Sequence, residues 1–404
     1  MTKTAEAAGA AAQPQGARAV HKSVWALGFV SMFMDISSEM VHALLPLYMV
    51  GVLGSSVLAV GLIEGIAEAT ASIVKVFSGA ISDRFGKRKL LAVVGYGLGA
   101  LTKPVFPLAG AMEWLVGARF VDRIGKGIRG APRDALVADL TPPALRGTAY
   151  GLRQTLDTIG AFTGPLLAMG LMWWTANNYR LVFWLAVLPA FLAVAVLVVF
   201  VREPPLPPAA RPRKLPLRRS ELVRLGKPYW TVVGIGLVFT LARFSEAFLI
   251  LRADAVGLAP MWAPVVLVLM GLAYALSAYP AGVLSDRRPR LDVLLAGLAL
   301  LIAADLVLAF VPGLWGLGLG VALWGLHMGF TQGLFNTLIA DSAPAELRGT
   351  AFGMFHLLTG VALLLASVIA GALWDTVGFR GTFACGALFA GLTAVGLLVL
   401  RRKA

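Results

Sequence analysis

The sequence predicts an all-helical integral membrane protein whose twelve transmembrane helices form two pseudosymmetric six-helix bundles. Its hydrophobic fraction is 58% and its mean hydropathy is +0.81, which are values of a membrane protein rather than of a soluble core. An internal repeat divides the chain, because ADLTPPALRGTAYG at residues 138–151 returns 202 residues later as ADSAPAELRGTAFG. Two parallel repeats of an apolar chain predict two related bundles around a shared midline.

The elements follow from apolar segments that are each long enough to cross a bilayer, which takes about 20 residues. The segments are 24–50, 57–80, 90–109, 112–138, 146–172, 180–201, 229–251, 262–284, 291–311, 314–340, 349–373 and 379–400. Proline and arginine crowd residues 202–228, so this stretch cannot insert. The expected domains are a disordered cytoplasmic tail (1–22), an N-terminal bundle (23–201), a cytoplasmic linker (202–228) and a C-terminal bundle (229–404).

The net charge of +14 is explained by membrane topology rather than by nucleic-acid binding. Most lysines and arginines fall in the tails or in the even-numbered loops, and only Arg180, Arg252 and Arg380 fall in odd-numbered loops. This bias places both termini in the cytoplasm. The single Cys385 excludes an intramolecular disulfide, and no nucleotide-binding motif is present, so we expect no cofactor and no ATP-driven pump.

A second repeat lies in the loops that follow spans 2 and 8, where GAISDRFGKR (79–88) is matched by GVLSDRRPR (282–290). The first copy resembles the signature loop of the major facilitator superfamily, which lies between spans 2 and 3. The resemblance implies a secondary transporter rather than an enzyme, working by alternating access, with this loop latching one conformation. The expected latch residues are Gly79, Asp83, Arg84, Gly86, Arg88, Asp286 and Arg287. The same basic residues also act as topology determinants.

Span 1 carries ionisable groups at bilayer depth, where each costs about 2.5–3.5 kcal/mol on insertion scales. Asp35, Glu39 and His42 share one helical face because they are spaced i, i+4 and i+7. Such a stripe can carry a proton, or it can form a metal site for Ni²⁺ or Co²⁺. The alternative is a structural hydrogen-bond stripe against another helix.

Further buried charges lie on spans 2, 4 and 5, so acids on spans 1 and 2 are expected to face bases on spans 4 and 5. The pair Ser38-Glu39 has a counterpart in Ser245-Glu246, which predicts that Glu246 also faces the central pathway. The candidate coupling and substrate residues are Asp35, Glu39, His42, Glu64, Glu68, Arg119, Asp122, Arg123, Lys126, Arg153, Asp157 and Glu246. Arg119 resembles the superfamily's span-4 arginine, although Asp122 and Arg123 replace the glutamine and glycine that usually follow.

Span 5 contains Gly160, Gly164 and Pro165, an element that resembles one in drug:proton antiporters and favours export; ordinary helix packing is its alternative. Residues 34–45, 61–67 and 122–134 resemble a bacterial branch that includes nickel-resistance exporters. We therefore expect a monomer in the bacterial inner membrane that couples proton entry to efflux of a small solute, with nickel or cobalt as the first candidate. Drug:proton antiport and transport of an anionic solute such as a siderophore stay open, with a membrane-embedded transferase or a sensor as remote alternatives.

Overall fold

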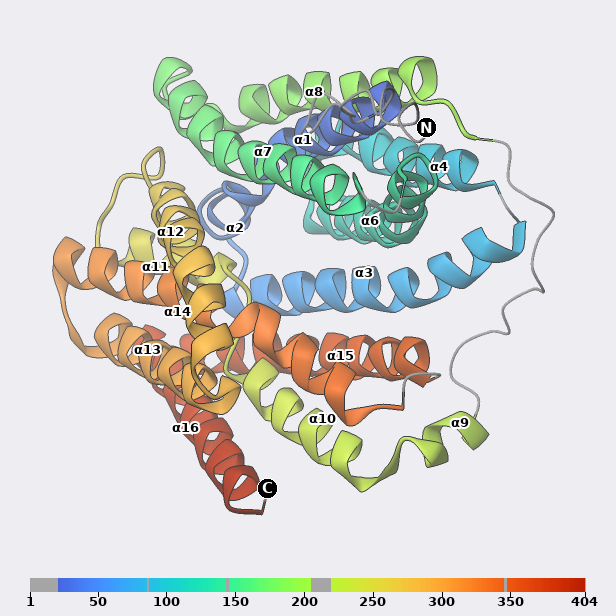
Figure 1. The fold of residues 1–404 in the computed structure, drawn as a ribbon. Helices are drawn as coiled ribbons and strands as arrows, with labels where there is room; N and C mark the ends of the chain where they lie inside the picture. Colours follow the sequence, from blue (N-terminus) through green and yellow to red (C-terminus); the bar gives the residue numbers. More distant parts are fainter. Residues whose placement is uncertain (1–20, 86, 143–144, 205–218, 345–346, 404) are drawn as a thin grey trace, which may run out of the picture.

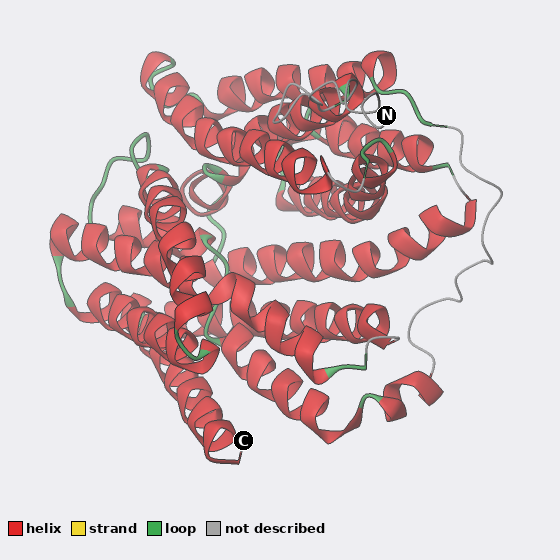
Figure 2. Ribbon diagram, viewed as in Figure 1, coloured by secondary structure: helices red, strands yellow, loops and turns green. Residues whose placement is uncertain are grey.

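The computed structural model describes residues 21–85, 87–142, 145–204, 219–344 and 347–403. Every regular element in these ranges is a helix (Figure 2). The N-terminal half contains α1 (Lys22–His42), α2 (Leu45–Leu47), the π-helical η2 (Tyr48–Val52), α3 (Val57–Phe85), α4 (Arg88–Thr102), α5 (Val105–Leu108), α6 (Met112–Asp139), α7 (Arg146–Trp174) and α8 (Tyr179–Phe200). The C-terminal half contains α9 (Arg219–Arg224), α10 (Gly226–Leu241), α11 (Ala247–Ala255), α12 (Val265–Arg287), α13 (Arg290–Phe310), α14 (Gly313–Ser342), α15 (Arg348–Val377) and α16 (Phe379–Lys403).

These elements correspond to the twelve predicted spans. Span 1 comprises α1, α2 and η2, span 3 comprises α4 and α5, and span 7 comprises α10 and α11. Within the described residues, eight helices are long and apolar enough to cross a membrane. The other four predicted spans are α6 and α7, which are rich in charged side chains, α12, and the interrupted pair α10 and α11.

The helices form two sets that meet along α3 and α15 (Figure 1). In one set α1 packs on α7 and α8, while α6 packs on α3 and α4; in the other α14 packs on α12 and α13. Glycines let α3 and α15 approach closely, because a Cβ at Gly61 would overlap the Ser367 carbonyl and one at Gly371 would meet the backbone of Leu58. The two helices are therefore antiparallel and in direct backbone contact.

The structure describes the expected tail and the expected linker only in part. The tail over residues 1–20 and the linker over 205–218 lie outside the described residues. The sequence predicts a linker up to residue 228, but α9 begins at Arg219 and α10 at Gly226. The physical reason is that Leu225 is buried in an apolar cluster with Tyr229 and Phe355, so this end of the linker joins the C-terminal set.

Candidate functional site

A cavity of about 310 Å³ lies between the two sets of helices. Residues of α1, α3 and α6 line one wall, and residues of α10, α14, α15 and the α10–α11 connection line the other. The lining residues are Glu39, His42, Glu64, Glu68, Arg123, Lys126, Thr240, Arg243, Phe244, Ser245, Glu246, Trp324 and Leu363. Both repeats therefore contribute to one polar chamber.

A break in span 7 supplies part of this wall. Helix α10 ends at Leu241 and α11 begins at Ala247, and the unwound backbone between them exposes Arg243, Phe244 and Ser245 to the cavity. The Ser245 N–H donates to the Ser367 hydroxyl of α15 at 3.3 Å, which fixes the break against a neighbouring helix. Irregular backbone at membrane depth is tolerated where it lines a cavity, because its polar groups find partners there.

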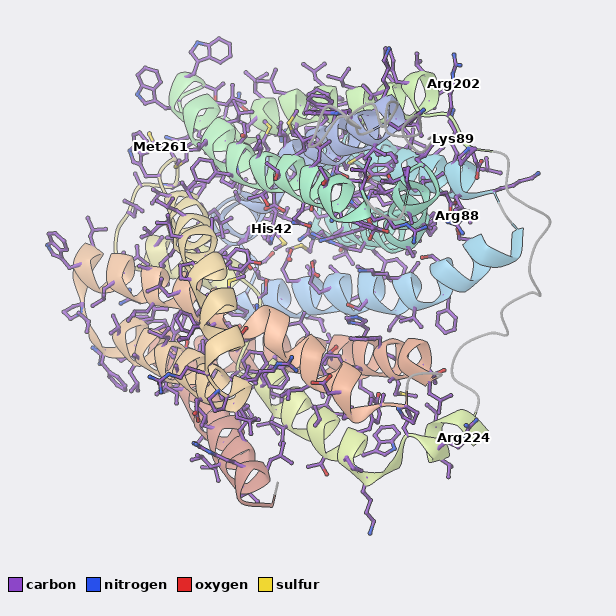
Figure 3. All side chains as sticks on the ribbon, in the orientation of Figure 1. His42, Arg88, Lys89, Arg202, Arg224 and Met261 are labelled. Carbon is purple, nitrogen blue, oxygen red and sulfur yellow. The ribbon has the colours of Figure 1, made fainter. Side chains whose placement is uncertain are left out.

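The wall formed by α1, α3 and α6 is a chain of alternating acids and bases centred on His42, which lies near the middle of the molecule (Figure 3). The His42 Nδ1 atom is 3.4 Å from the Glu39 carboxylate, and its Nε2 atom is 3.6 Å from the Glu64 carboxylate. Arg119 donates twice to Glu64, at 3.1 Å through Nε and 2.7 Å through Nη2. Because Glu64 and Arg119 are each only 1% exposed, this bidentate pair neutralises two buried charges.

A second acid–base chain runs beside the first. Lys103 of α4 donates to the Asp122 carboxylate at 3.0 Å and to the Ser38 hydroxyl at 3.2 Å. The Arg123 Nη1 atom is 3.0 Å from the Glu68 carboxylate. The expected pairing of acids with bases across the N-terminal bundle is therefore present between spans 2 and 4. The span-5 base Arg153 instead lies beside acids of spans 4 and 5.

The remaining charges of α7 form a separate cluster outside the cavity lining. Arg153 lies 3.6 Å from Asp157 on the same helix and 3.8 Å from Asp134 of α6. Arg133 bridges the same two acids, at 3.0 Å to Asp134 and 3.7 Å to Asp157. Arg153 and Asp157 thus tie α7 to α6 and do not line the chamber.

Seven of the twelve candidate residues line the cavity, namely Glu39, His42, Glu64, Glu68, Arg123, Lys126 and Glu246. Arg119 and Asp122 lie behind it and bond to lining residues or their neighbours. Asp35 is absent from the lining because it lies where α1 crosses α7: a Cβ at Gly160 would meet the Asp35 Cβ at 3.1 Å.

The metal site expected at Asp35, Glu39 and His42 is not formed. Across the described parts of the chain, no three His, Cys, Asp or Glu side chains are placed to hold a metal ion. The two His42 nitrogens face Glu39 and Glu64, whereas Asp35 is directed to the α7 crossing. One helical face is wide enough to contact two different neighbouring helices. Residues that share a face of α1 therefore need not belong to the same site.

The span-5 glycines serve that crossing. A Cβ at Gly164 would overlap the Glu39 Cβ, and one at Gly160 would meet the Met32 backbone. The interpretation of this element as helix packing is therefore supported directly, and it positions Glu39 in the cavity wall.

The predicted latch is only partly described. Gly86 lies outside the described residues, and for Asp83, Arg84, Asp286 and Arg287 only the helical backbone is described; Gly79 lies within α3. Arg88 forms an ion pair with Asp139 at 2.5 Å. Arg290 and Asp341, each 202 residues further on, form the same pair at 2.5 Å, so the repeat extends to this contact.

Six lining residues were missed as site residues: Thr240, Arg243, Phe244, Ser245, Trp324 and Leu363. The charge of Arg243 within an apolar segment was an available signal. The sequence gave no signal for the two aromatic residues, because an aromatic side chain in a span is ordinarily a packing residue. Their rings contact each other with centroids 5.3 Å apart, and they close the cavity wall on the side of α14.

Comparison with known proteins agrees with this architecture. Residues 27–355 and 247–404 match the Major Facilitator Superfamily. The chain belongs to this superfamily and is a multi-pass membrane transporter. It is 33% identical over 393 residues to the "Uncharacterized MFS-type transporter MJ1317" of Methanocaldococcus jannaschii, covering 95% of each chain.

Two further likenesses are more distant. The multidrug resistance protein MdtG of Enterobacter lignolyticus is 26% identical and aligns with 85% of this chain and 84% of its own. A crystal structure of the nucleoside transporter NupG superposes with a TM-score of 0.76 at 14% identity, covering 94% of this chain and 99% of that one. A likeness at this low identity shows the shared fold alone.

Proposed function

We propose that this transporter works by alternating access, that its solute binds in the chamber between the two halves, and that solute movement is coupled to protons. The observation that carries this proposal is that Glu39 and Glu246, at matching positions of the two repeats, face one cavity from opposite walls. A site shared by two rocking halves is the position from which a solute can be released to either side.

The chain of Glu39, His42, Glu64 and Arg119 supports proton coupling. A proton that binds at Glu39 weakens its attraction for His42, and His42 then interacts more strongly with Glu64. Entry of a cationic solute beside Glu39 has the same electrostatic consequence, so proton and solute compete for one carboxylate. Such competition is the physical basis of antiport.

We propose a small organic cation as the solute rather than a bare nickel or cobalt ion. Divalent transition metals require several ligands arranged around one point, and the described residues provide no such group. Carboxylates that are separated across a chamber, with Phe244 and Trp324 in its wall, suit an ammonium group on an organic body. The name of the MdtG relative is consistent with drug export, which makes efflux the proposed direction.

An anionic solute is the second candidate. Lys126 and Arg243 line the chamber, and neither forms an ion pair with a carboxylate in the described residues. We also propose that the protein resides in the cytoplasmic membrane with both termini in the cytoplasm, which the distribution of lysine and arginine supports.

Reconstitution tests these proposals. Purified protein in liposomes that contain a pH-sensitive dye is challenged with organic cations, organic anions, Ni²⁺ and Co²⁺. We expect organic cations to drive proton flux, and both Glu39→Gln and Glu246→Gln to lose it. Glu113→Gln is the matched control, since Glu113 is exposed in the first turn of α6 and does not line the chamber.

Each alternative has a distinct result in this assay. Flux driven by Ni²⁺ or Co²⁺ alone contradicts the organic solute, and flux driven by anions alone favours the second candidate. Solute uptake without proton movement removes the coupling role of Glu39. Full activity in Glu246→Gln shows that Glu246, in the C-terminal wall of the chamber, takes no part in the coupling.

A further inference from the structure

Arg252 is a buried cation on α11, outside the transport chamber. It is 2% exposed, its Nε donates to the Leu308 carbonyl at 3.0 Å, and its guanidinium lies 3.9 Å from the centroid of the Phe379 ring. These contacts hold the plane of the group in place but supply no negative charge. The two terminal nitrogens make no hydrogen bond to another described residue that would neutralise them.

A second cation stands at the same place. Arg252 and Arg380 line one pocket of about 180 Å³, together with residues at the end of α13 and the start of α14. Neither arginine forms an ion pair with any carboxylate among the described residues. Burying a charge without a counter-ion is costly, and a neighbouring like charge adds to the cost. An anion bound in the pocket would neutralise both charges.

Helix ends of both polarities line the pocket. Helices α14 and α16 begin there, at Gly313 and Phe379, whereas α11 and α13 end there, at Ala255 and Phe310. The net positive charge of the pocket therefore comes from its two arginines. Two of the three arginines that the topology places in odd-numbered loops thus meet in one pocket. The positive-inside bias makes this concentration of charge at that membrane face unexpected.

The equivalent region of the N-terminal half, at the start of α8, has different contacts. Arg180, at the start of α8, corresponds to Arg380 at the start of α16. In that half, however, the ring of Tyr179 packs on Tyr48 with centroids 5.7 Å apart, where the C-terminal half stacks Arg252 on Phe379. The buried cation is therefore a feature of one repeat, and the fold does not require it at this position.

We propose that the pocket of Arg252 and Arg380 binds a tetrahedral oxyanion, namely a phosphate group, either as the free ion or as the headgroup of an anionic phospholipid. The guanidinium of Arg252 matches the geometry of two phosphate oxygens, and Arg380 covers the bound group from the exposed side. The pocket volume suits a single such group. This site is separate from the transport chamber and does not depend on its function.

The test uses the purified full-length protein. In a delipidated detergent preparation, thermal unfolding is followed while sodium phosphate replaces sodium chloride at constant ionic strength. In a parallel arm, native mass spectrometry measures retention of phosphatidylglycerol against phosphatidylcholine. We expect phosphate to raise the melting temperature, phosphatidylglycerol to be retained in preference, or both, and each arm identifies one source of the phosphate group.

The variants decide whether the effect belongs to this pocket. Arg380 is exposed, so the Arg380→Gln variant should fold normally. We expect this variant to bind phosphate about tenfold more weakly, since it lacks one charge-assisted contact. Arg252→Gln should abolish binding, and Arg252→Lys should restore it only partly because the bidentate geometry is lost. Arg180→Gln is the matched control and should bind as the unaltered protein does.

The proposal is overturned if neither probe binds the unaltered protein. It is equally overturned if Arg380→Gln binds phosphate and phosphatidylglycerol as tightly as Arg180→Gln does. Should Arg252→Gln fail to fold, the comparison of Arg380→Gln and Arg252→Lys with the control still decides the matter.

Discussion

Single buried charges in this protein are held by specific partners, and Glu64 shows this most clearly. Its carboxylate accepts two hydrogen bonds from Arg119 and faces the ring of His42, and both members of the Glu64–Arg119 pair are almost fully buried. The net contribution of such a pair to stability is small, because its attraction offsets the cost of burying two charges. Removing one partner alone is different, because the other charge stays buried.

Glu64→Gln is therefore expected to destabilise the protein by about 3–5 kcal/mol, since it leaves Arg119 uncompensated. Thermal unfolding in detergent measures the effect, and Glu113→Gln serves as the exposed control. In the double variant Glu64→Gln with Arg119→Gln, we expect a loss smaller than the sum of the two single losses. Additive losses would show that the two side chains act independently.

At the scale of elements, close helix crossings position the chamber wall. Gly160 and Gly164 of α7 allow α1 to approach until backbone and Cβ atoms touch, and this contact fixes the orientation of Glu39. In span 7 the unwound segment between α10 and α11 performs the equivalent task for Glu246. The two repeats thus present matching carboxylates by different local structures.

Gly164→Val should separate α1 from α7, because its side chain would occupy the position of the Glu39 Cβ. We expect a strongly reduced yield of folded protein on size-exclusion chromatography, or a folded protein without transport activity. Gly170→Val on the same helix is the matched control, since no atom lies within 4 Å of a Cβ at that position. Equal behaviour of the two variants would contradict the close-crossing interpretation.

Across the whole molecule, the two halves are joined at the end where α3 begins. The Asp375 carboxylate of α15 accepts hydrogen bonds from the backbone N–H groups of Val57 at 3.1 Å and Leu58 at 2.9 Å. A carboxylate at a helix N-terminus is stabilised by unpaired N–H groups and by the helix dipole, typically by about 1 kcal/mol. Here the capping residue comes from the opposite half, so capping also holds the halves together.

Asp375→Ala is expected to shift the equilibrium toward conformations in which this end is open, by a factor of about five for a loss of about 1 kcal/mol. Spin labels at the exposed positions Val52 and Val377 in a Cys385→Ser background report the separation of the halves. Asp375→Asn keeps an acceptor without the charge, so its effect should be intermediate. An unchanged distance distribution in Asp375→Ala would exclude a latching role.

The sequence by itself determined the class of protein, the twelve spans and the two-fold repeat. These properties depend on the length and composition of apolar segments and on local matches, which a linear chain displays directly. It also identified Glu39, His42, Glu64, Glu68, Arg123, Lys126 and Glu246, because ionisable groups at membrane depth are costly and therefore conspicuous.

Only the tertiary structure decided which of these groups meet. Helical spacing places Asp35, Glu39 and His42 on one face, but the partners of that face come from α3 and α7, whose positions depend on long-range packing. For the same reason Glu68 pairs with Arg123 of α6, and Arg252 stands without a counter-ion among the described residues. Pairing energies act between atoms that are distant in sequence, so spacing along one helix limits the candidates but does not select among them.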